Sequence, residues 1–124
     1  MANTFKLKTK ANVGVTTVGI YTATSPVTAT VVIGVTMANV SGSSINVGLG
    51  ITRPSASGED VNLMKNIPIP QGSAFEFMGG NKVVLQTNDT LTAESDVNSS
   101  LDVALTIMEI TLEVTEYGTN KGSW

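Results

Sequence analysis

The sequence contains neither cysteine nor histidine, and these two absences remove several kinds of chemistry. Without cysteine there is no disulfide framework, no thiolate nucleophile and no cysteine-based metal site. Without histidine the commonest general base and the commonest metal ligand are both missing. A serine or threonine nucleophile would therefore lack its usual activating base. We expect a protein that is not an enzyme and that needs no cofactor and no metal.

Positive charge and long apolar runs are also scarce. Arg53 is the single arginine and the net charge is −3, so the basic face that binds nucleic acid is not expected. No apolar run approaches the ~18 residues that cross a bilayer. The start "MANTFKLKTK" has no apolar core of a secretory signal. We therefore expect neither nucleic acid nor a membrane among the partners.

Aromatic and charged residues are few, at 5% and 14% of the chain, whereas about a quarter of a typical domain is charged. Two explanations stay open: much of the surface faces other protein, or a surface rich in Thr, Ser and Asn faces water. A carbohydrate-binding face would need aromatic platforms. Tyr21, Tyr117 and Trp124 are the only tyrosines and tryptophan that could supply them. A carbohydrate-binding or host-surface module is therefore only a second alternative.

What the chain does contain is typical of β-structure. Val, Ile and Thr make up 40 of the 124 residues, and branching at Cβ favours strands over helices. Apolar and polar residues alternate in runs separated by Gly, Pro, Asn and Ser, which predicts eight or nine strands. We expect one domain over 1–124, an all-β antiparallel β-sandwich of jelly-roll or immunoglobulin-like shape. An N-terminal arm (1–12) and a C-terminal tail (115–124) would flank it.

Two strong alternations lie on either side of the turn Ser41–Ser44. In 27–37 the odd residues Val27, Ala29, Val31, Ile33, Val35 and Met37 would share one face, and in 45–51 Ile45, Val47, Leu49 and Ile51 would point inward. Two such runs joined by a short loop predict a β-hairpin. Outward Gly48 and Gly50 would allow another backbone to approach closely.

The last predicted strand, "LDVALTIMEITLEV", changes the parity of its apolar residues. Up to Ile107 they fall on odd positions, and from Ile110 they fall on even positions. A strand that exchanges its buried face predicts a β-bulge, here near Met108–Glu109, or a crossing from one packing surface to another.

The first predicted strand alternates strictly, with Phe5, Leu7 and Thr9 on one side and lysines on the other. This pattern predicts a half-buried strand whose outer face carries Lys6, Lys8 and Lys10. Such lysines protect an edge strand from aggregation. The alternative is an arm that docks on an acidic surface of a partner.

The stretch "IPIPQGS" reads first as a ligand motif. Pro68 and Pro70 lack an N–H, so this segment is excluded from a fully paired central strand. We expect an edge-forming corner in which Gly72 starts the turn to the next strand. The unpaired edge would be available to another subunit.

Carboxylates that could act in pairs occur at Glu59–Asp60 and at Asp96 and Asp102. Both sets lie in or beside predicted loops, where solvated acids are ordinary. They do not amount to an acid–base site.

The order of motifs from about Ala38 to Thr111 resembles small virion structural proteins of tailed bacteriophages, most closely capsid decoration (cement) proteins. The motifs are "NVSGSSINVGLGIT", "IPIPQGS", "GGNKVVL", "NDTLTAES" and "SSLDVALTIMEIT". They are patterns of β-structure and contain no catalytic signature. Residues 1–25 and those after Val114 are outside the resemblance.

The resemblance implies a virion protein, made in the host cytoplasm, that binds the outer capsid surface and bridges capsid subunits. Its partners would be the major capsid protein and copies of itself, as a homotrimer. A neck, tail or fibre component is the first alternative. The residues expected to contact partners are Lys6, Lys8, Lys10, Arg53, Pro68, Pro70, Tyr117 and Trp124.

Overall fold

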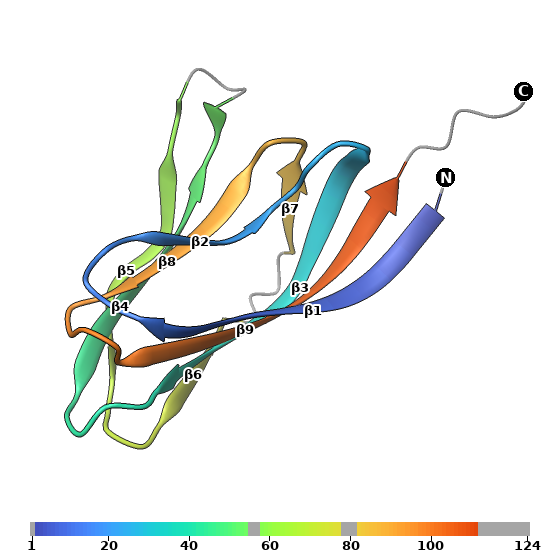
Figure 1. The fold of residues 1–124 in the computed structure, drawn as a ribbon. Coiled ribbons are helices and arrows are strands. Elements are labelled where there is room, and N and C mark those ends of the chain that lie inside the picture. The colour runs from blue at the N-terminus through green and yellow to red at the C-terminus, as the bar shows by residue number, and fades with distance from the viewer. Residues whose placement is uncertain (1, 55–57, 78–81, 112–124) are drawn as a thin grey trace, which may run out of the picture.

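A computed structural model describes residues 2–54, 58–77 and 82–111. Its strands form two antiparallel sheets and its described part contains no α-helix (Figure 1). The strands are β1 (Ala2–Val13), β2 (Val18–Thr22), β3 (Val27–Asn39), β4 (Ile45–Thr52), β5 (Val61–Ile69), β6 (Ala74–Phe77), β7 (Val83–Gln86), β8 (Thr90–Ser95) and β9 (Leu101–Thr111).

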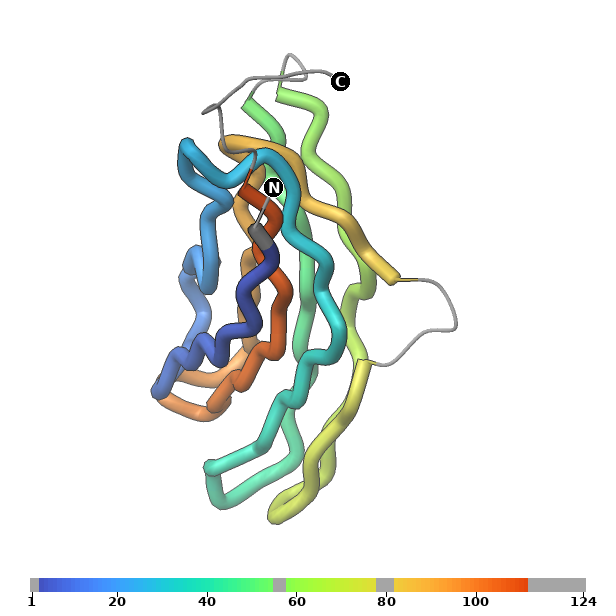
Figure 2. Tube along the Cα trace, turned by 90° about the vertical axis from the view of Figure 1, so that its right-hand side faces the viewer, coloured from blue at the N-terminus to red at the C-terminus, as the bar shows by residue number. Residues whose placement is uncertain are grey.

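The first sheet has the order β1-β9-β3, and the free side of β3 pairs with both β6 and β7. We call it sheet A. The second sheet, sheet B, has the order β2-β8-β4-β5. Figure 2 shows β1 and β2 (blue) along one side of the molecule and β6 and β7 (yellow) along the other. The predicted antiparallel β-sandwich is confirmed.

Apolar side chains from both sheets fill the space between them. On β4 the predicted inward residues Ile45, Val47, Leu49 and Ile51 are all buried. The largest fully buried side chains are Met37, Ile45, Leu49, Ile69, Leu85, Leu91, Leu101, Leu105 and Ile107. Burial of such aliphatic side chains, at roughly 1.5–3 kcal/mol each, is the main force that holds the sheets together.

The predicted hairpin of residues 27–37 and 45–51 is wrong. Strand β3 belongs to sheet A and β4 to sheet B, and the two do not pair. The turn between them crosses from one sheet to the other. Buried Asn39 fixes this crossing, because its Nδ2 donates to the carbonyl oxygens of Ser43 (2.8 Å) and Ile69 (2.9 Å). Both strands can then point their apolar sides into one core.

The parity change lies in β3 and not in β9, so the expected bulge near Met108–Glu109 is also wrong. Register shifts occur on β3 between Val27 and Ala29 and between Val32 and Gly34. The odd residues of β3 therefore do not share one face. Between the shifts, Thr30 and Val32 are buried, whereas Ala29, Val31 and Ile33 are only partly buried.

Strand β9 alternates without interruption. Its odd residues up to 109 are all buried, namely Leu101, Val103, Leu105, Ile107 and Glu109. The even residues, Met108 and Ile110 among them, therefore lie on the outer face of sheet A. The apolar pattern that suggested a bulge belongs instead to a strand that is apolar on both faces.

The expected corner at "IPIPQGS" is confirmed. Among the described strands β5 pairs only with β4, so it is an edge strand there, and Pro68 lies in it opposite Asn46. The turn that follows is closed by a hydrogen bond from the Ser73 N–H to the Pro70 carbonyl oxygen (3.1 Å). Gly72 in this turn has φ +74°, a conformation that glycine adopts without strain. The chain then enters sheet A as β6.

Candidate interaction surface

Strand β1 is oriented opposite to the prediction. The Phe5 and Leu7 side chains are 69% and 67% exposed on the outer face of sheet A. The lysines share the other side of the strand, and Lys6 pairs with Ile107, whose side chain lies in the core. The alternation was predicted correctly, but the lysine-lined outer face was not. Thus an edge strand presents its apolar side to the outside.

A buried carboxylate explains this orientation. Lys6 Nζ forms an ion pair of 2.8 Å with Glu109 Oε1. The Tyr21 hydroxyl donates to Glu109 Oε2 (2.6 Å) and lies 2.8 Å from the Thr30 hydroxyl. Glu109 would otherwise be an unpaired charge between the sheets, which is strongly unfavourable. The ion pair therefore holds the lysine side of β1 inward.

The same contacts shift the ionisation of both acidic groups. The hydrogen bond from Lys6, together with that from Tyr21, lowers the pKa of Glu109 below its ordinary value of 4.5. Burial, followed by the hydrogen bond to Glu109, raises the pKa of Tyr21 to about 12. Near neutral pH the network therefore consists of a carboxylate, an ammonium and a neutral phenol.

Replacement of Glu109 by glutamine is expected to reduce the change in the free energy of unfolding between neutral and acidic pH. A carboxylate whose pKa is lowered by folding stabilises the folded state above its ordinary pKa, and this stabilisation is lost as pH falls through the lowered value. We expect Glu109→Gln to reduce the free energy of unfolding by about 1–2 kcal/mol at neutral pH, because it removes the ion pair with Lys6. The loss is no larger because Lys6 is partly exposed and the ion pair is screened by solvent. Urea denaturation between neutral pH and pH 3 measures this.

The difference between Glu109→Gln and the wild type should shrink as the solution becomes acidic. Glu76→Gln, at an exposed glutamate of β6, is the control and should show no such convergence. A constant difference across the pH range would contradict a charged Glu109 in the folded protein.

The register of sheet A places four apolar residues in one row across four strands. Phe5 pairs with Met108, Met108 with Val31, and Val31 with Val84. Because paired residues share a face, this row lies on the outer face. Phe5 is 69% and Val84 54% exposed. We call Phe5, Met108, Val31 and Val84 the apolar row.

Four residues further along β1 and β9 the outer face is lined by small side chains. Thr9 pairs with Ala104, and Ala104 with Thr36. We call Thr9, Ala104 and Thr36 the small row. A hollow of about 240 Å³ lies there, lined also by Ala38 and Asp102. The outer face of sheet A therefore has a bulky part and a hollow part.

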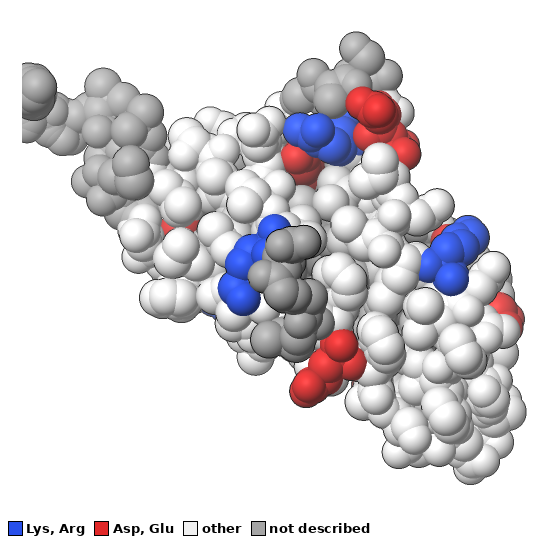
Figure 3. Space-filling model, turned by 180° about the vertical axis from the view of Figure 1, so that it is seen from behind, with Lys and Arg blue, Asp and Glu red and all other residues white. Residues whose placement is uncertain are grey.

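Charges are sparse on the described surface. Seen from behind, the molecule carries charged side chains in a few separate groups, and uncharged residues make up most of the surface between them (Figure 3). Of the residues of the two rows none is charged. Single exposed apolar residues are ordinary, whereas a contiguous apolar row is a candidate for an interaction surface.

The other residues predicted to contact partners are placed as follows. Arg53 is engaged within the chain, where its Nε donates to both oxygens of buried Asp89 (3.2 and 3.1 Å) and its Nη2 to Gln86 Oε1 (3.1 Å). Pro68 and Pro70 lie at the corner between the sheets, far along the chain from β1. Tyr117 and Trp124 lie outside the described residues.

The candidate carboxylates serve as hydrogen-bond acceptors for the backbone. Asp60 Oδ1 accepts from the Arg53 N–H (2.9 Å), Asp96 Oδ1 from the Asn46 N–H (2.9 Å), and Asp102 Oδ1 from the Asn12 N–H (3.0 Å). These bonds fix loops and strand ends. Among the described residues no group of three or more acidic side chains is placed to hold a metal ion.

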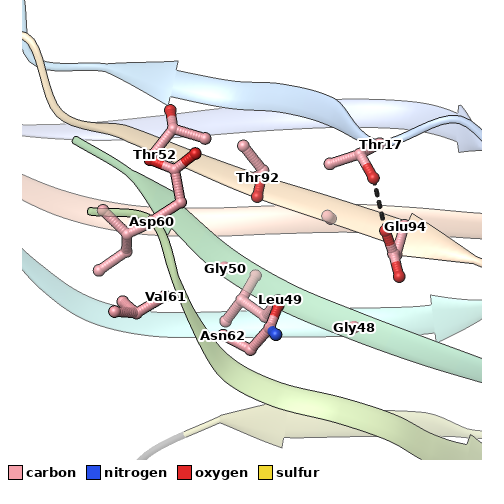
Figure 4. Close-up of a pocket in the computed structure, with 12 residues that line it drawn as sticks. Thr17, Gly48, Leu49, Gly50, Thr52, Asp60, Val61, Asn62, Thr92 and Glu94 are labelled. Atoms are coloured by element: carbon pink, nitrogen blue, oxygen red, sulfur yellow. Dashed lines mark hydrogen bonds between the residues drawn. The ribbon is translucent and has the colours of Figure 1, made fainter. Parts of the chain in front are cut away.

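A second hollow, of about 200 Å³, lies on the outer face of sheet B (Figure 4). Gly48 and Gly50 lie along it on β4, and the Thr17 hydroxyl donates to Glu94 at one end. A Cβ at Gly50 would lie 2.9 Å from the Val61 carbonyl oxygen. The close backbone approach predicted for these glycines is therefore found at Gly50, where the approaching backbone is β5 of the same chain, whereas the atoms nearest to Gly48 belong to the Glu94 side chain.

Comparisons with known proteins identify the fold. No protein-family model and no curated protein matches the sequence. Among solved structures, a chain of the Bacillus endospore appendages, reported as a novel family of disulfide-linked pili, matches with TM-score 0.54 and 15% identity over 90% of this chain and 88% of that chain. A chain from the acid-stable capsid of Helicobacter pylori bacteriophage KHP30 matches with TM-score 0.53 and 13% identity over 89% of each.

At these identities the likeness shows a shared fold and no more. Both structures contain this β-sandwich within a larger assembly, a pilus and a capsid. In its described part the present chain has no helix long and apolar enough to cross a membrane.

Proposed function

We propose that this chain is a non-enzymatic structural subunit of a bacteriophage virion, and specifically a decoration protein of the capsid. The observation that carries the proposal is the orientation of β1, which turns Phe5 and Leu7 outward. Exposure of an apolar face of this kind to water is unfavourable, and burial of the face in an assembly would remove this unfavourable contact. The partners would be the major capsid protein and further copies of this chain.

Two further observations support the proposal. The fold occurs in a phage capsid structure, and the motif order resembles tailed-phage virion proteins. The chain has no cysteine, so its assembly contacts would not include disulfide links like those named for the endospore appendages. Stabilisation of a shell would then follow from geometry, because a copy that touches more than one capsid subunit adds buried contacts that must break before the subunits separate.

Copy number and particle stability test this function. We expect hundreds of copies per particle, and we expect particles that lack the chain to open at lower temperature and under milder osmotic shock than complete particles. Quantitative mass spectrometry of purified virions and a thermal release assay of the genome measure both. Equal resistance of the two kinds of particle would contradict the bridging role.

A fibre or tail component is the second candidate, because the fold also occurs in a pilus. The same mass spectrometry separates the two candidates. A dozen copies or fewer per particle would indicate the neck or tail, whereas a number that scales with the capsid subunits would indicate the shell.

A further inference from the structure

We propose that the outer face of sheet A pairs with the same face of a second copy of this chain around a two-fold axis that passes near Thr106. This inference deepens the proposed function by naming the occupant of the face. It rests on the distribution of large and small side chains over that face.

The apolar row and the small row lie on opposite sides of a central row. Leu7 pairs with Thr106, and Thr106 with Gly34. On β1 and β9 the apolar row lies two residues to one side of this central row and the small row two residues to the other. Thr106 is on β9, the middle one of the three strands β1, β9 and β3. The face is therefore divided evenly about Thr106.

A two-fold axis through this point superposes complementary residues. The axis lies between the two faces, perpendicular to the strands, so it places Phe5 opposite Thr9 of the second copy, Met108 opposite Ala104, and Val31 opposite Thr36. It also places the 67% exposed Leu7 opposite Leu7 of the second copy, as an apolar contact at the axis. Each of these large side chains of the apolar row thus meets a small one, and each such contact occurs twice, as a two-fold interface requires. Two sheets packed in this way stack at about 10 Å.

The charges of the face are compatible with this pairing. Its carboxylates, Asp102 and Glu76, both lie toward the small row, since Glu76 pairs with Thr36 and Asp102 lines the hollow. The two-fold rotation carries them to the opposite end of the partner's face, so they do not meet each other. Like charges brought together would have disfavoured the pair.

The edges of the sheets are less suitable contacts. The inward lysines of β1 and the register shifts of β5 are devices that discourage strand addition at an edge. The face has neither device. This favours packing of face on face over extension of either sheet into a neighbour.

The size of the face predicts a weak pair. Four strands about 4.8 Å apart and seven residues of about 3.4 Å give a flat area of about 15 by 24 Å. This is less than half of the roughly 800 Å² that each partner contributes to a standard interface. Pairing should therefore depend on concentration in solution and become complete where copies are held close together, as on a particle. The apolar row and the small row lie on the same face, so two copies are enough to bring each row against its complement. The structure therefore favours a pair over the trimer that the sequence resemblance implied.

Charge reversal at the axis tests the proposal, since a residue on a two-fold axis faces its own copy. Thr106→Glu and Thr106→Lys should each remain monomeric, because they place like charges together. An equimolar mixture of the two should pair at least tenfold more tightly than either variant alone. Sedimentation equilibrium over a range of concentrations measures this. Asn62→Glu and Asn62→Lys, at an exposed residue of sheet B, are the matched controls and should pair like the wild type.

The outcomes separate this inference from the proposed function. If wild type stays monomeric at all concentrations and the mixture does not pair, the two-fold pair is wrong. If such a monomer still binds virions, the capsid protein occupies the face and the proposed function stands. If the wild type pairs and the mixture rescues pairing but no virion contains the chain, the pair stands and the proposed function fails.

Discussion

Replacement of Ile107 by alanine should lower the free energy of unfolding by about 2–5 kcal/mol, whereas the same replacement at Ile110 should cost about 1 kcal/mol or less. Ile107 is fully buried between the sheets, and Ile110 lies three residues further along the same strand on the outer face. Alanine at 107 leaves a cavity in a packed core, but at 110 it removes a side chain that already contacts solvent.

This pair of variants compares two structures of β9 directly. They share residue type, strand and substitution, so β-propensity is matched. Guanidinium denaturation of each variant gives the two free energies. Nearly equal losses would mean that Ile110 is also buried, as a bulge near Met108–Glu109 would place it, and would overturn the unbroken alternation of β9.

Removal of the two exposed apolar residues of β1 should strongly weaken association without weakening the fold. The double variant Phe5→Thr with Leu7→Thr keeps β-forming residues in the strand. Both side chains are mostly exposed, so we expect the free energy of unfolding to change by no more than about 0.5 kcal/mol per site. Loss of a buried aromatic contact typically costs an interface 2 kcal/mol or more, so binding to particles should fall by about thirtyfold or more.

The control for this variant is Val61→Thr, at a 45% exposed valine on β5 of sheet B. It removes apolar surface of the other sheet and should bind particles like the wild type. Binding is measured by adding purified chain to particles that lack it and quantifying the bound fraction after sedimentation. If the double variant unfolds more easily than the wild type by several kcal/mol, Phe5 and Leu7 are core residues and the orientation of β1 is wrong.

Local patterns in the sequence were sufficient to predict most strands, the sandwich class and the corner at Pro68–Gly72. These features depend on alternation and on the backbone restrictions of proline and glycine, which act within a few residues. The inward side of β4 was predicted correctly for the same reason, since its apolar residues alternate with glycines and polar residues along the strand. These apolar residues are Ile45, Val47, Leu49 and Ile51.

The orientation of β1 could not be predicted in this way. Its alternation fits either face, and the choice depends on Glu109, which is far along the chain and buried beside Tyr21. The predicted hairpin of residues 27–37 and 45–51 was wrong because an alternating pattern does not indicate which sheet a strand joins. The proposed interaction surface was missed, since Phe5, Met108, Val31 and Val84 become neighbours only through the strand order. The one local signal was the apolar character of both faces of β9.

The most direct test is the solvent accessibility of the outer face of sheet A in an intact particle. Because the chain has no cysteine, Leu7→Cys introduces a single thiol on this face, and Val61→Cys introduces one on sheet B as the control. The free chain in dilute solution should react rapidly with a maleimide at either position. In intact virions we expect Val61→Cys to remain reactive and Leu7→Cys to be protected. Equal reactivity of Leu7→Cys in free chain and particle would contradict an assembly role for this face.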